Sequence, residues 1–181
     1  MINRVFAIII LIILLPLFIL ISILIYLIEG NPIFFIQQRI GKDNKLFKMY
    51  KFRTMKINTP NVATHHLHNP KKYIYPFGAI LRNFSIDELP NIINIVMGEM
   101  DFIGPRPALY NQNDLMALRK KYGIDKMNPG LSGWAQINGR DEISIEEKVE
   151  LEKYYLENKS ILMDIRIFLK SFYSFLPGTI K

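Results

Sequence analysis

The N-terminal part of the chain is an unbroken apolar run. Residues 5–28 carry no charged side chain and consist almost entirely of Ile, Leu, Val, Phe and Ala. A helix over this run would be ~36 Å long, and the hydrocarbon core of a bilayer is ~30 Å thick. The pattern therefore predicts a membrane-inserted segment over residues 1–30, followed by a second unit over residues 31–181.

A proline at the middle of the run predicts that this helix kinks or breaks. Pro16 has no N–H to donate to the carbonyl of Ile12, and its ring pushes that carbonyl away. Two topologies follow: a single span, or a re-entrant pair of half-helices of ~17 Å each that returns to the same face. A signal peptide is the least favoured interpretation, because no small-residue cleavage site follows the run.

The charges that flank the run bear on the choice of topology. Arg4 and the N-terminal amine precede it, and the remainder of the chain has more Lys and Arg than Asp and Glu. Positive flanks tend to stay cytoplasmic, which favours the re-entrant arrangement. Irregular backbone at membrane depth is costly unless protein covers it, which favours the span. The residues alone leave both topologies open.

The patterns after the run predict a mostly helical α+β unit with one β-hairpin. Residues 33–55 alternate and are rich in aromatic and β-branched side chains around a turn at residues 40–44. Residues 56–76 predict a loop, in which His65, His66 and His68 lack acidic neighbours and are expected to be solvated rather than metal-bound. Helical pieces are expected from residue 77, over 109–122, 144–157 and 161–176, interrupted by Gly104-Pro105-Arg106-Pro107 and an ordered loop at 128–140.

The helix expected over residues 161–176 has an amphipathic pattern. Its apolar residues, which include Ile161, Ile165 and Phe168, fall at helical spacing, and Arg166 and Lys170 lie among them. Such a helix either lies in a membrane interface or packs its apolar face into a core, and the sequence leaves both alternatives open.

Composition narrows the partners and the compartment. The net charge is +7 and the isoelectric point is about 9.5, which is compatible with nucleic acid, anionic lipid or a phosphate-rich substrate. The chain has no cysteine, which excludes disulfides and thiolate metal sites and fits a reducing compartment.

Two adjacent acids, Asp87 and Glu88, are the densest candidate for chemistry. Their structural interpretation is a capping box of Ser85 and Glu88 ahead of a helix that has Pro90 in its first turn. Their functional interpretation is that a carboxylate at a helix N-terminus stays ionised and serves as a nucleophile or a metal ligand, beside N–H groups that bind phosphate.

Four arginines strengthen the functional interpretation. Arg82 precedes Asp87, Arg106 lies between two prolines, Arg53 ends the hairpin and Arg140 closes the Gly-rich loop. Guanidinium groups match phosphate oxygens in a bidentate manner. Adjacent acids with several arginines suit phosphoryl transfer, in which carboxylates bind Mg²⁺ or attack phosphorus while the cations bind a diphosphate.

At these residues the chain resembles the bacterial sugar transferases, the small monotopic polyprenyl-phosphate phosphoglycosyl transferases that start membrane-linked glycan assembly. Four stretches carry the resemblance, at residues 37–55, 77–107, 128–140 and 163–167. The family usually has Ser before the membrane proline, where this chain has Leu15.

The resemblance implies a mechanism and a location. A UDP-sugar is the expected donor, and an undecaprenyl-type phosphate is the expected acceptor. Asp87 would attack the β-phosphorus, expel UMP and carry a covalent phosphosugar, while Glu88 would assist through Mg²⁺ or proton handling. Arg82 and Arg106 would lie near phosphates, with Arg53 and Arg140 at less defined positions. The resemblance also favours a re-entrant segment in the bacterial inner membrane, with the catalytic domain and interfacial amphipathic helices on its cytoplasmic face.

Two other functions compete with this one. A membrane-anchored, non-catalytic basic domain would explain the positive charge but not the clustered acids. A glycosyltransferase that moves only the sugar would release UDP instead of UMP. We expect membrane lipid as a partner and no nucleic acid; the sequence does not predict the sugar, the glycan pathway or the oligomeric state.

Overall fold

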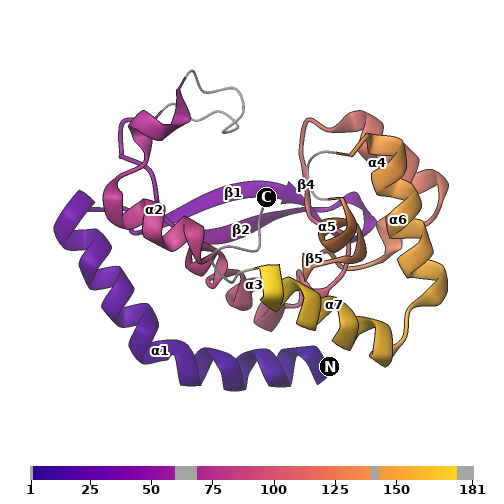
Figure 1. Cartoon of the computed structure of the whole chain (residues 1–181), viewed down its shortest axis with the longest axis horizontal. Coiled ribbons are helices and arrows are strands. Elements are labelled where there is room, and N and C mark those ends of the chain that lie inside the picture. Colours follow the sequence, from indigo (N-terminus) through magenta and orange to yellow (C-terminus); the bar gives the residue numbers. More distant parts are fainter. Residues whose placement is uncertain (1, 60–68, 140–142, 175–181) are drawn as a thin grey trace.

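The computed structural model describes residues 2–59, 69–139 and 143–174, which form a mostly helical α+β fold (Figure 1). Twelve helices and strands are accompanied by the short 3₁₀ turns η1 (Lys42–Asn44), η3 (Pro70–Tyr73), η4 (Ile86–Glu88) and η5 (Ile124–Lys126). In chain order they are α1 (Ile2–Glu29), β1 (Phe34–Ile40), β2 (Leu46–Phe52), α2 (Pro76–Asn83), α3 (Asn91–Met97), β3 (Asp101–Ile103), β4 (Ala108–Leu109), α4 (Asn113–Lys121), β5 (Gly130–Ser132), α5 (Trp134–Asn138), α6 (Ile145–Asn158) and α7 (Ile161–Ser174).

The predicted hairpin is confirmed. Strands β1 and β2 pair antiparallel, with Phe34 opposite Phe52 and Ile40 opposite Leu46. The turn between them uses Asp43 and Asn44 at φ values of 55° and 58°, a left-handed conformation that Asp and Asn tolerate better than most residues. The short strand β4 adds to the other edge of β1, and β3 pairs in parallel with β5.

The N-terminal run forms one helix, α1, that is long and apolar enough to cross a membrane. It stays helical through Pro16, and Figure 1 shows it bending near its middle, so the expected kink takes the form of a bend within a continuous helix. Its two halves run along one side of the rest of the molecule.

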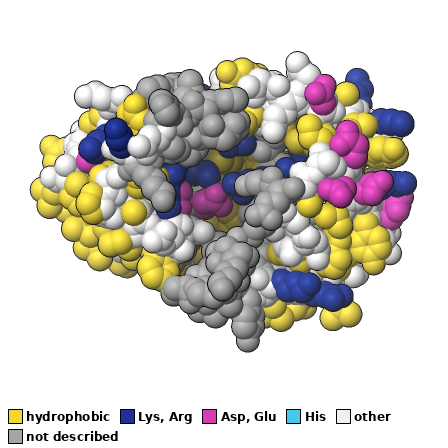
Figure 2. Space-filling view, turned by 45° about the horizontal axis from the view of Figure 1, so that its top comes forward, with side chains coloured by type: hydrophobic (Ala, Val, Ile, Leu, Met, Phe, Trp, Pro, Cys, Tyr) yellow, Lys and Arg dark blue, Asp and Glu magenta, His cyan; other side chains and the backbone are white. Residues whose placement is uncertain are grey.

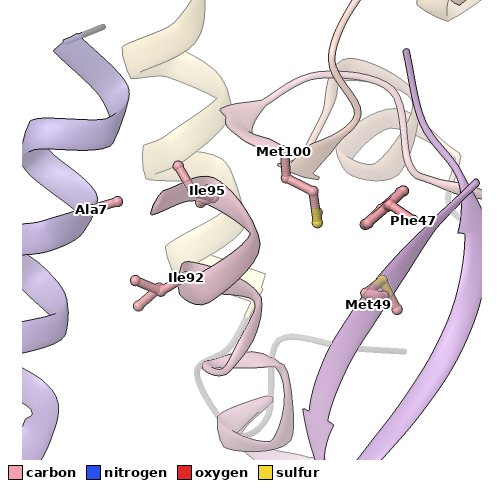
Figure 3. Close-up of a cluster of buried hydrophobic side chains, with 6 residues drawn as sticks. All are labelled: Ala7, Phe47, Met49, Ile92, Ile95 and Met100. Carbon is pink, nitrogen blue, oxygen red and sulfur yellow. The ribbon is translucent and has the colours of Figure 1, made fainter. Parts of the chain in front are cut away.

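Helix α1 packs on the rest of the chain at several points along its length. Ala7 belongs to a buried cluster with Phe47 and Met49 of the hairpin and with residues of α3 (Figure 3). Further along α1, Phe18 packs edge-on against Phe52, at 5.2 Å between ring centroids. The opposite face of α1 leaves large apolar side chains exposed, among them Ile2, Ile9, Ile12, Ile13, Leu15, Ile19, Leu20, Ile23 and Leu27.

Helix α7 has one face buried in the core and one apolar face that is exposed. Its inner face buries Met163 and Ile167 in a cluster with Tyr155. Its outer face leaves Ile161, Leu162, Ile165, Phe168 and Leu169 between 51% and 80% exposed. The helix therefore contributes to the core and also presents an apolar stripe to its surroundings.

Other local predictions had mixed outcomes. The helix expected over 144–157 is confirmed as α6, and a capping box of Ser144 and Glu147 begins it. The one predicted at Ser85 and Glu88 is wrong: Ser85 has a left-handed φ of 52° and makes no side-chain capping bond, because the Glu88 side chain pairs with cations elsewhere. The expected loop at 128–140 contains β5 and α5. His65, His66 and His68 lie outside the described residues.

Candidate functional site

Asp87 and Glu88 lie together on η4, the short turn that joins α2 to α3. The left-handed backbone of Ser85 reverses the chain after α2, and η4 then packs beside β2. Asp87 is only 9% exposed. Among the described residues, no basic side chain forms an ion pair with its carboxylate.

Glu88 accepts contacts from two cations that come from distant parts of the chain. Lys51 of β2 lies with its Nζ 2.6 Å from Oε1 of Glu88, and Nη2 of Arg106 lies 3.3 Å from the same oxygen. The three side chains are partly exposed, Arg106 most of all at 38%. Figure 2 shows this face of the molecule, where acidic side chains lie in a central hollow bordered by Lys and Arg.

The surroundings shift the pKa values of Asp87 and Glu88 in opposite directions. Burial raises the pKa of Asp87 to about 6, although Lys51 counteracts it, and the neighbouring Glu88 raises it further. Burial alone would also raise the pKa of Glu88, but Lys51 and Arg106 together lower it to about 2. A pair of acids with separated pKa values is a common property of catalytic sites. At neutral pH both are ionised, with Asp87 the more basic and less solvated.

Arg106 is positioned by the rigid segment between β3 and β4. The prolines on either side of it restrict its backbone, and Nη2 of Arg119 donates to its carbonyl oxygen at 2.9 Å. Arg119 is itself buried on α4 and paired with Glu152 of α6, at 2.5 and 2.8 Å. The structure thus places Arg106, one of the arginines singled out from the sequence, beside Glu88.

The other two predicted arginines that the structure describes, Arg82 and Arg53, make different contacts. Nε of Arg82 donates to Oγ1 of Thr54 at 2.9 Å, and the charge of Arg82 lies close enough to lower the pKa of Asp87 slightly. The carbonyl of Arg53 accepts a hydrogen bond from the hydroxyl of Tyr75, and no described contact joins the Arg53 guanidinium to either acid. Arg140 lies outside the described residues.

Three residues of the site were not predicted from the sequence. They are Lys51, Arg39 and Asn91, from β2, β1 and the start of α3. Strand alternation gives the basic residues a polar face, but no sequence signal tells which face meets the acids. Asn91 directly follows Pro90 in the acidic motif, and only its burial at 2% exposure singles it out.

A small cavity lies beside Glu88. Arg39, Asn91, Arg106 and Pro107 line it, with Met49, Met100, Gly130 and Leu131 forming the remainder of its wall. Its enclosed part measures about 10 Å³, roughly the space of one water molecule. The Oδ1 atom of Asn91 is buried and has no hydrogen-bond partner in the described part of the chain.

Some oxygen atoms at this site are of the kinds that bind magnesium ions. No group of three or more His, Cys, Asp or Glu side chains gathers among the described residues. Mg²⁺, however, is commonly held by one or two carboxylates together with substrate phosphates and water. Asp87 and Glu88 supply the carboxylates, and Asn91 supplies an unpartnered amide oxygen in the cavity that Glu88 also lines.

Comparison with known proteins gives a consistent result. A family model described as bacterial sugar transferase matches residues 1–178. The uncharacterized sugar transferase EpsL of Bacillus subtilis (strain 168) is 39% identical over 138 residues, which cover 76% of this chain and 67% of the relative. The exopolysaccharide production protein ExoY of Sinorhizobium fredii (strain NBRC 101917 / NGR234) is 35% identical over 180 residues, which cover 91% of this chain and 79% of the relative.

A longer relative carries a more specific name. The UDP-glucose:undecaprenyl-phosphate glucose-1-phosphate transferase of Escherichia coli (strain K12) is 36% identical over 182 residues. The match covers 96% of this chain but only 39% of that relative.

Proposed function

The chain belongs to the bacterial sugar transferase family, and from this premise we propose that it transfers a sugar 1-phosphate from a UDP-sugar to undecaprenyl phosphate and releases UMP. The name of the Escherichia coli relative supports this donor and this acceptor. The observation that carries the proposal is the site itself: two adjacent acids with opposite pKa shifts face Lys51 and Arg106. These groups suit the transfer of a negatively charged phosphoryl group.

In the proposed first step, a carboxylate oxygen of Asp87 attacks the β-phosphorus of the donor. A bond forms between that oxygen and phosphorus, the bond to the bridging oxygen breaks, and UMP leaves with the electron pair. Asp87 suits this role because it is desolvated and has no ion-pair partner among the described residues, so no salt bridge has to break first.

In the proposed second step, a phosphate oxygen of the lipid attacks the same phosphorus and expels the Asp87 carboxylate. The product is a polyprenyl diphosphate sugar, and Asp87 is regenerated. One phosphoanhydride is broken and another is made over the cycle, so positioning and charge stabilisation dominate the catalysis. The covalent intermediate lets one site serve a water-soluble donor and a lipid acceptor in turn.

Glu88 acts as an anion in this proposal. A carboxyl group whose pKa is about 2 is a poor proton carrier at neutral pH, which favours magnesium binding over proton handling. Asp87 and Glu88 would hold Mg²⁺, which would neutralise charge on the donor's phosphates. Lys51 keeps Glu88 ionised and, with Arg106, offsets the negative charge of the site.

We propose that the protein is monotopic, with α1 re-entering the cytoplasmic face of the bacterial inner membrane. Near the start of α1, Nδ2 of Asn3 donates to Oδ1 of Asp101 at 2.8 Å, and Ala7 packs on the domain. Near its end, Ile25 is fully buried against the same domain. A span of ~30 Å would carry one of these ends across the bilayer and break its contacts.

Nucleotide release tests the proposed reaction. Detergent-solubilised protein is mixed with Mg²⁺, undecaprenyl phosphate and a panel of UDP-sugars, with Asp87→Asn as the control. We expect UMP from at least one donor and none from the control. Release of UDP would indicate ordinary glycosyl transfer, and no nucleotide from the panel together with salt-sensitive DNA binding would favour a non-catalytic basic domain.

A further inference from the structure

Arg39 is a cation of the site that forms no ion pair within the described part of the chain. Its Nε and Nη2 atoms donate to Oε1 of Gln37 at 3.0 and 2.7 Å, and its Nη1 donates to the carbonyl of Pro107 at 3.1 Å. All three acceptors are uncharged. A guanidinium group has five N–H donors, so two remain beyond the three bonds described. Arg39 is therefore held in place with binding capacity to spare.

Arg39 and Arg106 line the same cavity and repel each other. Burial, and then the proximity of Arg106, lower the pKa of Arg39 to about 10, and Glu88 offsets this only in part. Glu88 is at the same time shared between Lys51 and Arg106. Like charges held close together in a poorly solvated recess are costly unless an anion lies between them. Glu88 offsets the two guanidinium charges only in part, so an anion bound between Arg39 and Arg106 would lower their mutual repulsion further.

We propose that Arg39 adds a second guanidinium group to the phosphate site that the family resemblance assigns to Arg106, so that the two form one phosphate-binding subsite beside Glu88. This inference rests on the proposed function, which brings two kinds of phosphate to the site, one on the nucleotide and one on the lipid. The enclosed space beside the two side chains is only about 10 Å³, so the anion would contact Arg39 and Arg106 from the solvent side of the recess. Two guanidinium forks bind the oxygens of a tetrahedral anion in a bidentate manner, which single ammonium groups do not.

The two arginines have different parts in this subsite. Arg39 is fixed by Gln37 and Pro107 and forms the rigid wall. Arg106 is 38% exposed, and its contact with Glu88, at 3.3 Å, is longer than the 2.6 Å contact of Lys51. Arg106 is thus the partner that exchanges Glu88 for an incoming phosphate. Glu88 keeps Lys51 during the exchange and loses one competitor for a metal ion.

Binding of inorganic pyrophosphate tests the subsite without turnover. Isothermal titration of the detergent-solubilised full chain compares wild type with Arg39→Gln and Arg39→Lys. Lys126→Gln is the charge-matched control, because Lys126 pairs with Asp43 on the exposed surface. We expect Arg39→Gln to weaken binding at least tenfold, Arg39→Lys to weaken it severalfold and the control to change it less than twofold.

Two further comparisons identify the source of the phosphate. If Arg39 binds the nucleotide's phosphate, Arg39→Gln removes the advantage of UMP over uridine. If it binds the lipid's phosphate, Arg39→Gln removes the advantage of a short-chain polyprenyl phosphate over the matching polyprenol. Either loss supports the subsite and assigns its ligand, and the absence of both overturns it.

The outcomes also separate this inference from the proposed function. A folded Arg39→Gln variant that binds pyrophosphate within twofold of wild type overturns the subsite, even where UMP is released normally. Loss of pyrophosphate binding in a protein that turns over no UDP-sugar supports the subsite and contradicts the proposed function. Should Arg39→Gln fail to fold, wild-type affinity in Arg39→Lys overturns the subsite.

Discussion

Asp87 and Glu88 are neighbours in the chain, yet they meet different surroundings. Asp87 is desolvated and has no ion-pair partner among the described residues, whereas Glu88 contacts Lys51 and Arg106. The fold therefore disfavours the ionised form of Asp87 and stabilises the ionised form of Glu88. Such a division is expected where one acid reacts and its neighbour binds a cation.

The raised pKa of Asp87 predicts how activity depends on pH. Because only the ionised carboxylate attacks phosphorus, the first step should slow as pH falls through about 6. At subsaturating Mg²⁺, where the metal-free site predominates, the ionised fraction at pH 5, and with it kcat/KM, should be about tenfold below the plateau near pH 8. UMP release measured from pH 5 to pH 8 checks this. Asp114→Asn, an exposed acid on α4, should leave the profile unchanged, and an unbroken plateau down to pH 5 would exclude Asp87 as the titrating nucleophile.

The same shift predicts the stability of Asp87→Asn. The pKa of Asp87 rises from 3.8 to about 6 on folding, so its charged form opposes folding at neutral pH, and stability is regained as pH falls from about 6 towards 3.8. Asp87→Asn should be inactive but up to about 3 kcal/mol more stable at pH 7. Below pH 4 this difference should vanish. Thermal unfolding at pH 7 and pH 4 measures it, and a destabilised variant at pH 7 would contradict the prediction.

At the scale of elements, the ion pair of Arg119 and Glu152 joins α4 and α6 and reaches the site. Both side chains are buried, at 7% and 2% exposure, and Arg119 also binds the carbonyl of Arg106. The pair thus stabilises the packing of two helices and fixes the segment that carries Arg106.

Removing one partner of this pair should be strongly destabilising. Glu152→Gln leaves the buried Arg119 charge without its counterion and should cost about 3–5 kcal/mol. The double change of Arg119→Met with Glu152→Leu should recover much of that stability but not the activity, since Arg106 loses the contact to its carbonyl. Urea unfolding and UMP release measure the two effects.

The exposed pair of Lys153 and Glu157 provides the matched control. It is an i,i+4 pair at 3.6 Å on the same helix, α6. Glu157→Gln should cost about 0.5 kcal/mol or less.

Full activity in the double variant Arg119→Met with Glu152→Leu would show that Arg119 does not position Arg106.

At the scale of the whole molecule, the apolar faces of α1 and α7 bear on the proposed membrane topology. Both helices expose large apolar side chains while their other faces pack on the domain. Figure 1 shows α7 and the N-terminal half of α1 along the same side of the molecule. This arrangement fits a protein that rests on one leaflet.

Cysteine labelling checks this topology directly, because the chain has no native cysteine. Single substitutions Ile2→Cys and Phe35→Cys flank α1, and Glu157→Cys marks the surface of the domain. We expect a membrane-impermeant maleimide to label all three only after the cells are opened. Labelling of Ile2→Cys in intact cells, with the other two protected, would establish a span.

The sequence by itself determined the features that depend on neighbours along the chain. Apolar runs, alternation and turn residues identified α1, the hairpin and α6. The acids and Arg106 stood out because Asp-Glu and Pro-Arg-Pro are local patterns. Ser85 shows the limit of this reasoning. Ser85 and Glu88 match the capping-box pattern, but Ser85 makes no capping bond and the Glu88 side chain contacts Lys51 and Arg106 instead.

Only the tertiary structure decided which cations face the acids. Lys51 and Arg39 are ordinary polar positions of a hairpin, and Asn91 is an ordinary residue at a helix start. They belong to the site because β2 packs beside η4 and β4 pairs with the end of β1. Contacts between residues distant in sequence depend on how whole elements pack, and local patterns do not encode them. The opposite pKa shifts of Asp87 and Glu88 arise from the same packing, because burial and charge proximity exist only in the folded chain.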